Sequence, residues 1–209
     1  MNMEYYLGMI GMIAFSVTAV LAVSDKGIDL FGAIVMGLIT ATGGGTLRDV
    51  IIEVPIFWSI DQNYLWISIA ASILAFYGNR WVAKKRIYQL MLYLDGIGVA
   101  LFAIQAAGKV YDLDFALPLG PIMLGVITAI GGGLIRDVLA GKPTLLMRRE
   151  LYAVPLTLGC IFYIFLINQF PNSRGLIALA CVVFTFAFRA AAIYWKLTVP
   201  NWMMLKTTD

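Results

Sequence analysis

The chain has 209 residues, of which 61% are hydrophobic and only 13% are charged, and its formal net charge is +3. A soluble domain of this size cannot cover so much apolar surface, whereas a lipid bilayer can. The sequence contains no histidine, which excludes imidazole-based catalysis. It also lacks a nucleotide-binding loop. We therefore expect neither an enzyme nor a nucleic-acid-binding protein.

Seven apolar stretches follow one another along the chain, each about long enough to cross a hydrocarbon core. Short polar or turn-forming segments separate them. We predict an all-α membrane protein whose single transmembrane domain covers residues 1–209 and is surrounded by the lipid bilayer. The predicted spans are 5–23, 29–52, 64–82, 88–107, 116–140, 150–168 and 174–195.

One sequence pattern occurs twice, with an offset of 88 positions. The stretch from Thr40 to Val50 returns as Thr128 to Val138, and each copy has three glycines followed two residues later by Arg-Asp-Val. Each half contains three spans, and because three is odd the second copy must lie inverted relative to the first. The layout predicts two inverted repeats, at about 5–82 and 88–168, and an extra helix at about 174–195.

The glycine runs predict breaks in the second and fifth helices. Each glycine costs about 1 kcal/mol relative to alanine in a helix interior, so three in a row allow a kink, unwinding or close approach of another backbone. Carbonyl oxygens freed by a break would be suitable cation ligands. Tight helix packing is the alternative. The candidate pore residues, with a monovalent cation near the glycines, are Thr40, Gly43, Gly44, Gly45, Thr128, Gly131, Gly132 and Gly133.

Charged residues after each glycine run are further candidate pore residues. They are Arg48 and Asp49 in the first copy and Arg136 and Asp137 in the second. Neighbours on a helix point about 100° apart, so we expect each to find its partner on another span. The alternative is that they only hold the bundle together at its two mouths.

Asp95, in the fourth span, completes the set of candidates. An acid in the membrane requires a cation, which Arg136, Arg189 or a permeating ion can supply, and we favour a salt bridge. Arg189 is expected to extend its side chain to the membrane interface.

Basic residues are distributed unevenly between the two ends of the predicted bundle. Because basic loops stay in the cytoplasm, we expect a multi-pass protein of a prokaryotic plasma membrane, with the N-terminus outside and the C-terminus inside. The outer end has only Lys109 and Arg174. The inner end has Lys26, Arg80, Lys84, Lys85, Arg86, Lys142, Arg148, Arg149, Lys196 and Lys206.

The doubled glycine, arginine and aspartate motif, with spans arranged as three, three and one, resembles the prokaryotic trimeric intracellular cation (TRIC) channels. These sequences have also been catalogued as putative glycine transporters. The resemblance implies a homotrimer in which each protomer has its own pore for K⁺ and Na⁺, with helices kinked at the glycine runs. Animal members bind a phosphoinositide there, but here glycines stand one turn before Arg136, where the lysine would be. We expect no cofactor besides the permeant ion, with bound lipid as a further candidate.

The residues leave two functions open. A passive monovalent cation channel accounts for the paired glycine runs and the scarcity of buried acids. A secondary transporter of a small solute such as glycine is the alternative, because inverted repeats with broken helices also characterise carriers.

Overall fold

The computed structural model describes residues 3–81 and 84–200, with the side chains of residues 5–81 and 86–200. Lys206, and the side chains of Lys84 and Lys85, which entered the predicted topology, lie outside this part. Eight α-helices and no strand occur in the described ranges. The α-helices are α1 (Met3–Val23), α2 (Leu30–Ile51), α3 (Phe57–Ile60), α4 (Asn63–Gly78), α5 (Lys84–Asp112), α6 (Leu119–Leu139), α7 (Ala153–Gln169) and α8 (Arg174–Tyr194). The 3₁₀ segments are η1 (Asn79–Trp81), η2 (Leu145–Met147) and η3 (Pro171–Ser173).

Within the described ranges, five helices have the length and composition to cross a membrane: α1, α2, α5, α6 and α8 with the preceding η3. The apolar helix α7 has 17 residues and α4 has 16. At a rise of 1.5 Å per residue, α4 is about 24 Å long, shorter than a hydrocarbon core of about 30 Å. The all-helical membrane fold is therefore confirmed, while the count of seven spans stays a prediction.

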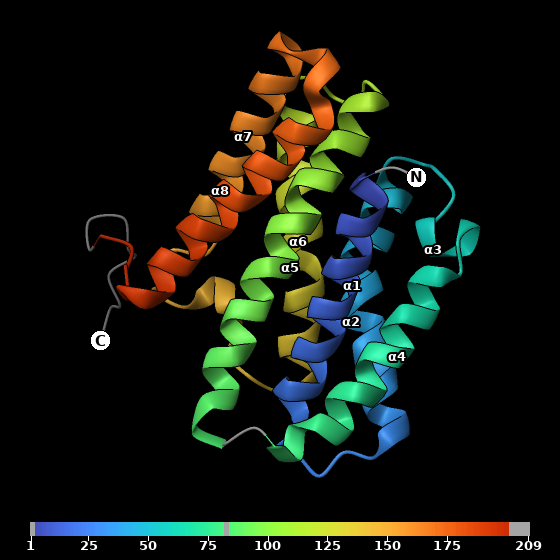
Figure 1. Cartoon of the computed structure of the whole chain (residues 1–209), viewed down its shortest axis with the longest axis vertical. Coiled ribbons are helices and arrows are strands. Elements are labelled where there is room, and N and C mark those ends of the chain that lie inside the picture. The colour runs from blue at the N-terminus through green and yellow to red at the C-terminus, as the bar shows by residue number, and fades with distance from the viewer. Residues whose placement is uncertain (1–2, 82–83, 201–209) are drawn as a thin grey trace, which may run out of the picture.

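The longest helix, α5, has 29 residues and is the centre of the bundle. It contacts α1, α6, α7 and α8. Helices α1, α2 and α4 pack together on one side of it, and α7 and α8 lie against each other on the other (Figure 1). Small residues of α5, including Ala100, Ala103 and Ala107, are fully buried and let neighbouring helices approach closely.

Both glycine runs lie inside uninterrupted helices. Helix α2 is continuous from Leu30 to Ile51 and α6 from Leu119 to Leu139, so the prediction of glycine-broken helices is wrong. The physical reason is the cost of backbone amides that lose their partners away from water, which is several kcal/mol per group. The carbonyls that the prediction assigned to an ion are instead engaged in helical hydrogen bonds.

The glycines serve the close packing of α2 against α6. A Cβ atom added at Gly44 would lie 2.0 Å from the Thr128 carbonyl oxygen, and one at Gly132 would lie 2.3 Å from the Thr40 carbonyl oxygen. These distances are far below van der Waals contact, so only glycine allows the two backbones to cross here. Packing, the alternative weighed from the sequence, is the explanation that the structure supports.

Candidate functional site

The crossing of α2 and α6 buries the two threonines of the repeated pattern. Thr40 is fully buried and Thr128 is 2% exposed. Their carbonyl oxygens face the middle glycine of the opposite run. Their hydroxyl groups make no hydrogen bond within the described part of the chain. The crossing thus buries two hydroxyls that have no hydrogen-bond partner in the described part of the chain.

The other glycines of the runs face different neighbours. A Cβ at Gly43 would meet the end of a side chain, Ile135, and one at Gly45 would meet the ring of Phe57. A Cβ at Gly131 would lie 3.3 Å from the Cα of Gly44. The environment of Gly133 is polar, because its Cβ would lie 3.4 Å from the Asp95 carboxylate and 3.6 Å from the Arg136 guanidinium.

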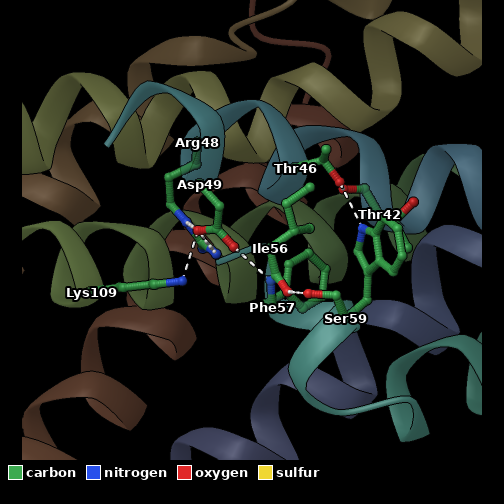
Figure 2. Close-up of polar contacts among 9 residues, drawn as sticks. Thr42, Thr46, Arg48, Asp49, Ile56, Phe57, Ser59 and Lys109 are labelled. Carbon is green, nitrogen blue, oxygen red and sulfur yellow. Dashed lines mark hydrogen bonds and ion pairs between the residues drawn. The ribbon is translucent and has the colours of Figure 1, made fainter. Parts of the chain in front are cut away.

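Asp49 is the centre of a charged cluster at the C-terminal end of α2 and is fully buried. Arg48 Nε donates to its Oδ1 at 2.8 Å, and Lys109 Nζ of α5 donates to the same oxygen at 2.7 Å (Figure 2). The backbone N–H of Phe57 donates to Oδ2 at 2.9 Å. The carboxylate therefore ties α5 and the start of α3 to the end of α2.

The prediction that Arg48 and Asp49 would each find a partner on another span is wrong for Arg48, which pairs with Asp49 itself. The long arginine side chain spans the angular offset between neighbours. The prediction holds for Asp49, which also pairs with Lys109. Lys109 was interpreted from the sequence only as a loop charge, because its partner is 60 positions away.

Arg136 is the centre of a second cluster, at the C-terminal end of α6, and is fully buried. Its Nη1 donates to Asp95 Oδ1 of α5 at 2.7 Å and to Thr18 Oγ1 of α1 at 3.1 Å. Its Nε donates to Asp137 Oδ1 at 2.9 Å. The predicted salt bridge of Asp95 is confirmed, and Arg136 is its partner. Thr18 had no signal in the sequence beyond being polar within an apolar span.

The two clusters share one construction. The backbone N–H of Leu145 donates to Asp137 Oδ2 at 3.1 Å, as that of Phe57 does to Asp49, and both pairs are eight residues apart. The clusters differ in the additional partner that α5 supplies. Lys109 joins the aspartate of the first cluster, whereas Asp95 joins the arginine of the second.

Arg189 of α8 is only 1% exposed, so the prediction that it reaches the membrane interface is wrong. Its Nη1 donates to the Leu151 carbonyl oxygen at 3.2 Å, and its Nη2 lies 3.4 Å from Glu150 Oε2. Its guanidinium carbon lies 4.9 Å from the centroid of the Tyr152 ring. These partners hold two of the three guanidinium nitrogens inside the protein, while the buried Nε has no hydrogen-bond partner in the described part of the chain.

Each charged cluster borders a cavity, and the two cavities open at opposite ends of the bundle. The Arg48 cavity, of about 380 Å³, lies near the start of α1 and the ends of α2 and α5. The Asp137 cavity, of about 700 Å³, lies near the end of α1, the start of α5 and the end of α6. Lys142 Nζ lies 3.0 Å from Asp25 Oδ1 at the latter, and this hydrogen bond lowers the pKa of Asp25.

Aromatic and charged side chains separate the two cavities. The buried rings of Phe15 on α1 and Phe102 on α5 lie 5.1 Å apart between their centroids. Phe102 also lines the Arg48 cavity. Phe15 was not among the candidates, because an aromatic residue in an apolar span has no distinguishing pattern.

Comparison with known proteins identifies the family. A family model described as "Glycine transporter" matches residues 5–80 and 92–168. The UPF0126 inner membrane protein YadS of Escherichia coli strain K12 is 34% identical over 202 residues, which cover 96% of each chain. The structure of a TRIC channel orthologue from Rhodobacter sphaeroides superimposes with a TM-score of 0.86 at 31% identity, covering 93% of this chain and 98% of that one. The chain belongs to the prokaryotic TRIC family.

Further relatives agree with this assignment. The UPF0126 membrane protein YvgT of Bacillus subtilis is 33% identical over 205 residues, covering 93% of this chain and 94% of the relative. The structure of a prokaryotic TRIC channel in 0.5 M KCl matches with a TM-score of 0.86 at 27% identity, covering 94% of this chain and 98% of that one. Together with the five apolar helices, the family makes this TRIC-family chain a multi-pass membrane protein.

Proposed function

We propose that the chain is a monovalent cation channel for K⁺ and Na⁺, with a pore between α1, α2, α5 and α6 of each protomer. The pair of cavities carries this proposal, because they enter the same bundle from opposite ends. Along α5, Met91 lines the Asp137 cavity and Phe102 lines the Arg48 cavity. On a helix these two residues are about 16 Å apart, so only a short section separates the cavities.

This closed section contains the groups that a conducting state has to move or pass. They are the Phe15–Phe102 ring pair and the salt bridge between Arg136 and Asp95. The buried hydroxyls of Thr40 and Thr128 are free to hydrogen-bond water once it enters this section. In this proposal, the pore residues predicted from the sequence contribute side-chain contacts and helix packing, and the glycine carbonyls are not ion ligands.

Two inverted repeats account for the similar construction of the two mouths. The hydrogen bonds of Asp49 and Asp137 recur with the offset of the sequence repeat. The family model matches each half of the chain. The clusters lie at opposite ends of the bundle, as inverted halves require. The proposal also includes seven membrane spans, with the N-terminus outside and the C-terminus in the cytoplasm, as the basic residues predict.

The choice of ion and assembly is supported by the relatives. The solved structures similar to this chain are described as trimeric intracellular cation channels, one of them in 0.5 M KCl. We therefore include a homotrimer of independently conducting protomers in the proposal. The proposal also includes a bound lipid as a candidate ligand.

Recordings of the purified protein in planar lipid bilayers test the proposed function. We expect unitary current steps whose reversal potential follows the K⁺ gradient, with comparable currents in Na⁺. Membranes treated with detergent alone are the control. Reversal at the Cl⁻ equilibrium potential would contradict the proposed cation selectivity.

Secondary transport of glycine is the competing function, and the description of the matching family model favours it. Two cavities separated by a closed section also fit alternating access. Counterflow of radiolabelled glycine in proteoliposomes separates the two functions. Saturable glycine exchange without unitary currents would show that the protein is a carrier and not a channel.

A further inference from the structure

A series of buried contacts leads from α8 to Arg136, at the closed section of the proposed pore. The guanidinium of Arg189 lies over the ring of Tyr152 and donates to the carbonyl oxygen of the residue before it, Leu151. The hydroxyl of Tyr152 donates to Asp95 Oδ2 at 3.0 Å. The other oxygen of Asp95 accepts from Arg136 at 2.7 Å. All four side chains in this series are at most 3% exposed.

Two glycines provide the space for these contacts. A Cβ at Gly133 would lie 3.5 Å from the Tyr152 hydroxyl oxygen, and one at Gly96 would lie 3.3 Å from Cγ of Arg189. The first cluster has no equivalent, because Gly45, the counterpart of Gly133, faces the Phe57 ring instead. The contacts therefore belong to the half of the molecule that α8 covers.

The segment after α8 holds the backbone next to Tyr152. Two backbone hydrogen bonds pair residues 197–199 with residues 149–151, at N···O distances of 3.2 Å and 2.9 Å. This pairing is antiparallel and directly precedes Tyr152. The position of the tyrosine ring is thus fixed from two sides, by Arg189 of α8 and by the paired segment.

We infer that Tyr152 is a positioning residue that holds Asp95, and through it Arg136, in the closed arrangement, and that α8 and residues 197–199 hold Tyr152. The effect on conduction rests on the proposed channel function. A group that binds one of two states more strongly shifts the population toward it. The extra helix outside the two repeats then serves to set the balance between closed and open pores.

The substitution Tyr152→Phe removes the hydroxyl and keeps the ring. We expect the ratio of open to closed time to rise roughly tenfold, the size of effect given by one hydrogen bond to a charged group, at unchanged unitary conductance. Tyr111→Phe is the matched control, because its hydroxyl also bonds a side chain, Asn168, but at the other end of α5. An open-to-closed ratio within twofold of the wild type, or a changed unitary conductance, would overturn the inference.

Amide hydrogen exchange of the same variants in lipid nanodiscs gives a readout that does not require current. We expect faster exchange near Gly133 and Arg136 in the Tyr152→Phe variant and not in the Tyr111→Phe variant. Equal exchange in the two variants would overturn the positioning role even if currents differ. Absence of any current in the wild type would instead refute the proposed channel, while the exchange rates would still decide the role of Tyr152.

Discussion

The Thr128 carbonyl oxygen leaves no space for a methyl group at Gly44. The substitution Gly44→Ala would place a Cβ 2.0 Å from that oxygen, so α2 and α6 have to separate. We expect the free energy of unfolding to fall by about 2–3 kcal/mol, as for other overpacked contacts. Thermal unfolding in detergent, followed by tryptophan fluorescence, measures this change.

Gly43→Ala is the control for this prediction, because its Cβ would meet only the flexible end of the Ile135 side chain, at 2.8 Å. Both substitutions gain the same helix propensity, so the difference between them reports the crossing. Equal stabilities of the two variants would show that α2 and α6 do not touch at Gly44.

Asp95 neutralises a buried arginine, which makes its charge more important than that of an exposed acid. The substitution Asp95→Asn leaves Arg136 with Asp137 as its remaining carboxylate partner. We expect a loss of about 3 kcal/mol in the free energy of unfolding, because breaking a buried ion pair leaves an uncompensated charge. Denaturation by SDS in mixed micelles measures it.

The half-exposed ion pair between Asp112 and Arg174 provides the matched control. Asp112→Asn removes the same charge at the other end of α5, and we expect a loss below about 1 kcal/mol because water screens the pair. If both substitutions lower the free energy of unfolding by the same amount, burial is not the reason that Asp95 stabilises the protein.

Sequence reasoning found the charged residues of both clusters but only some of their partners. A salt bridge of Asp95 was expected because an acid in the membrane requires a cation, but the sequence did not decide between Arg136 and Arg189 as its partner. The contact between Arg48 and Asp49 was missed because helix geometry alone ignores the reach of a long side chain. The roles of Thr18 and Tyr152 depend on contacts more than 55 positions apart in the chain, which no local pattern reveals.

The sequence pattern correctly indicated that the repeated glycines of α2 and α6 are important, but the predicted helix breaks are absent and the glycines allow close packing instead. Three glycines lower helix propensity in water, which favours a break. Within a bilayer the backbone keeps its hydrogen bonds, and the same glycines allow a neighbouring backbone to approach. The sequence pattern identifies which helices cross, whereas the conformation of α2 and α6 depends on the partner that each one meets.

The pairing of residues 197–199 with 149–151 is the element whose removal tests the role of the C-terminal segment. The substitution Val199→Pro removes the N–H that donates to the Arg149 carbonyl oxygen at 2.9 Å. We expect the open-to-closed ratio of the channel to rise about threefold, less than for Tyr152→Phe, because Arg189 still holds the ring. Single-channel recording measures the ratio.

Val199→Ala is the control for this change, since it shortens the side chain and keeps the N–H group. We expect its currents to match those of the wild type. Equal open-to-closed ratios in the proline and alanine variants would show that the backbone pairing has no part in gating.

The sequence repeat explains why one chain has two similar charged clusters at opposite ends of the bundle. Each cluster has an aspartate that accepts from an arginine and from a backbone N–H eight residues later. The difference between them comes from α5, which supplies Lys109 at one end and Asp95 at the other. This difference arises from packing between the two halves. Comparing the two copies of the repeat in the sequence therefore predicts the arginine and aspartate that both clusters share, but not the partner that α5 adds to each.

The proposed inverted arrangement requires α4 to cross the membrane although it has only 16 residues. The 3₁₀ segment Asn79–Trp81 continues it, and local thinning of the bilayer accommodates a short span at modest cost. We expect Gln62→Cys, before α4, and Arg80→Cys, after it, to lie on opposite sides of the membrane. Labelling of intact cells with an impermeant maleimide measures this, in a background where the buried Cys160 and Cys181 are replaced by alanine.

The Gln62→Cys variant should react in intact cells, whereas the Arg80→Cys variant should react only after permeabilisation, because the basic end is expected to face the cytoplasm. Denatured samples of both variants, which should label fully, control for expression. Labelling of both positions from the same side would mean that α4 does not span the bilayer. The first half would then contain two spans, the second copy would no longer be inverted, and the two cavities would not open on opposite sides of the membrane.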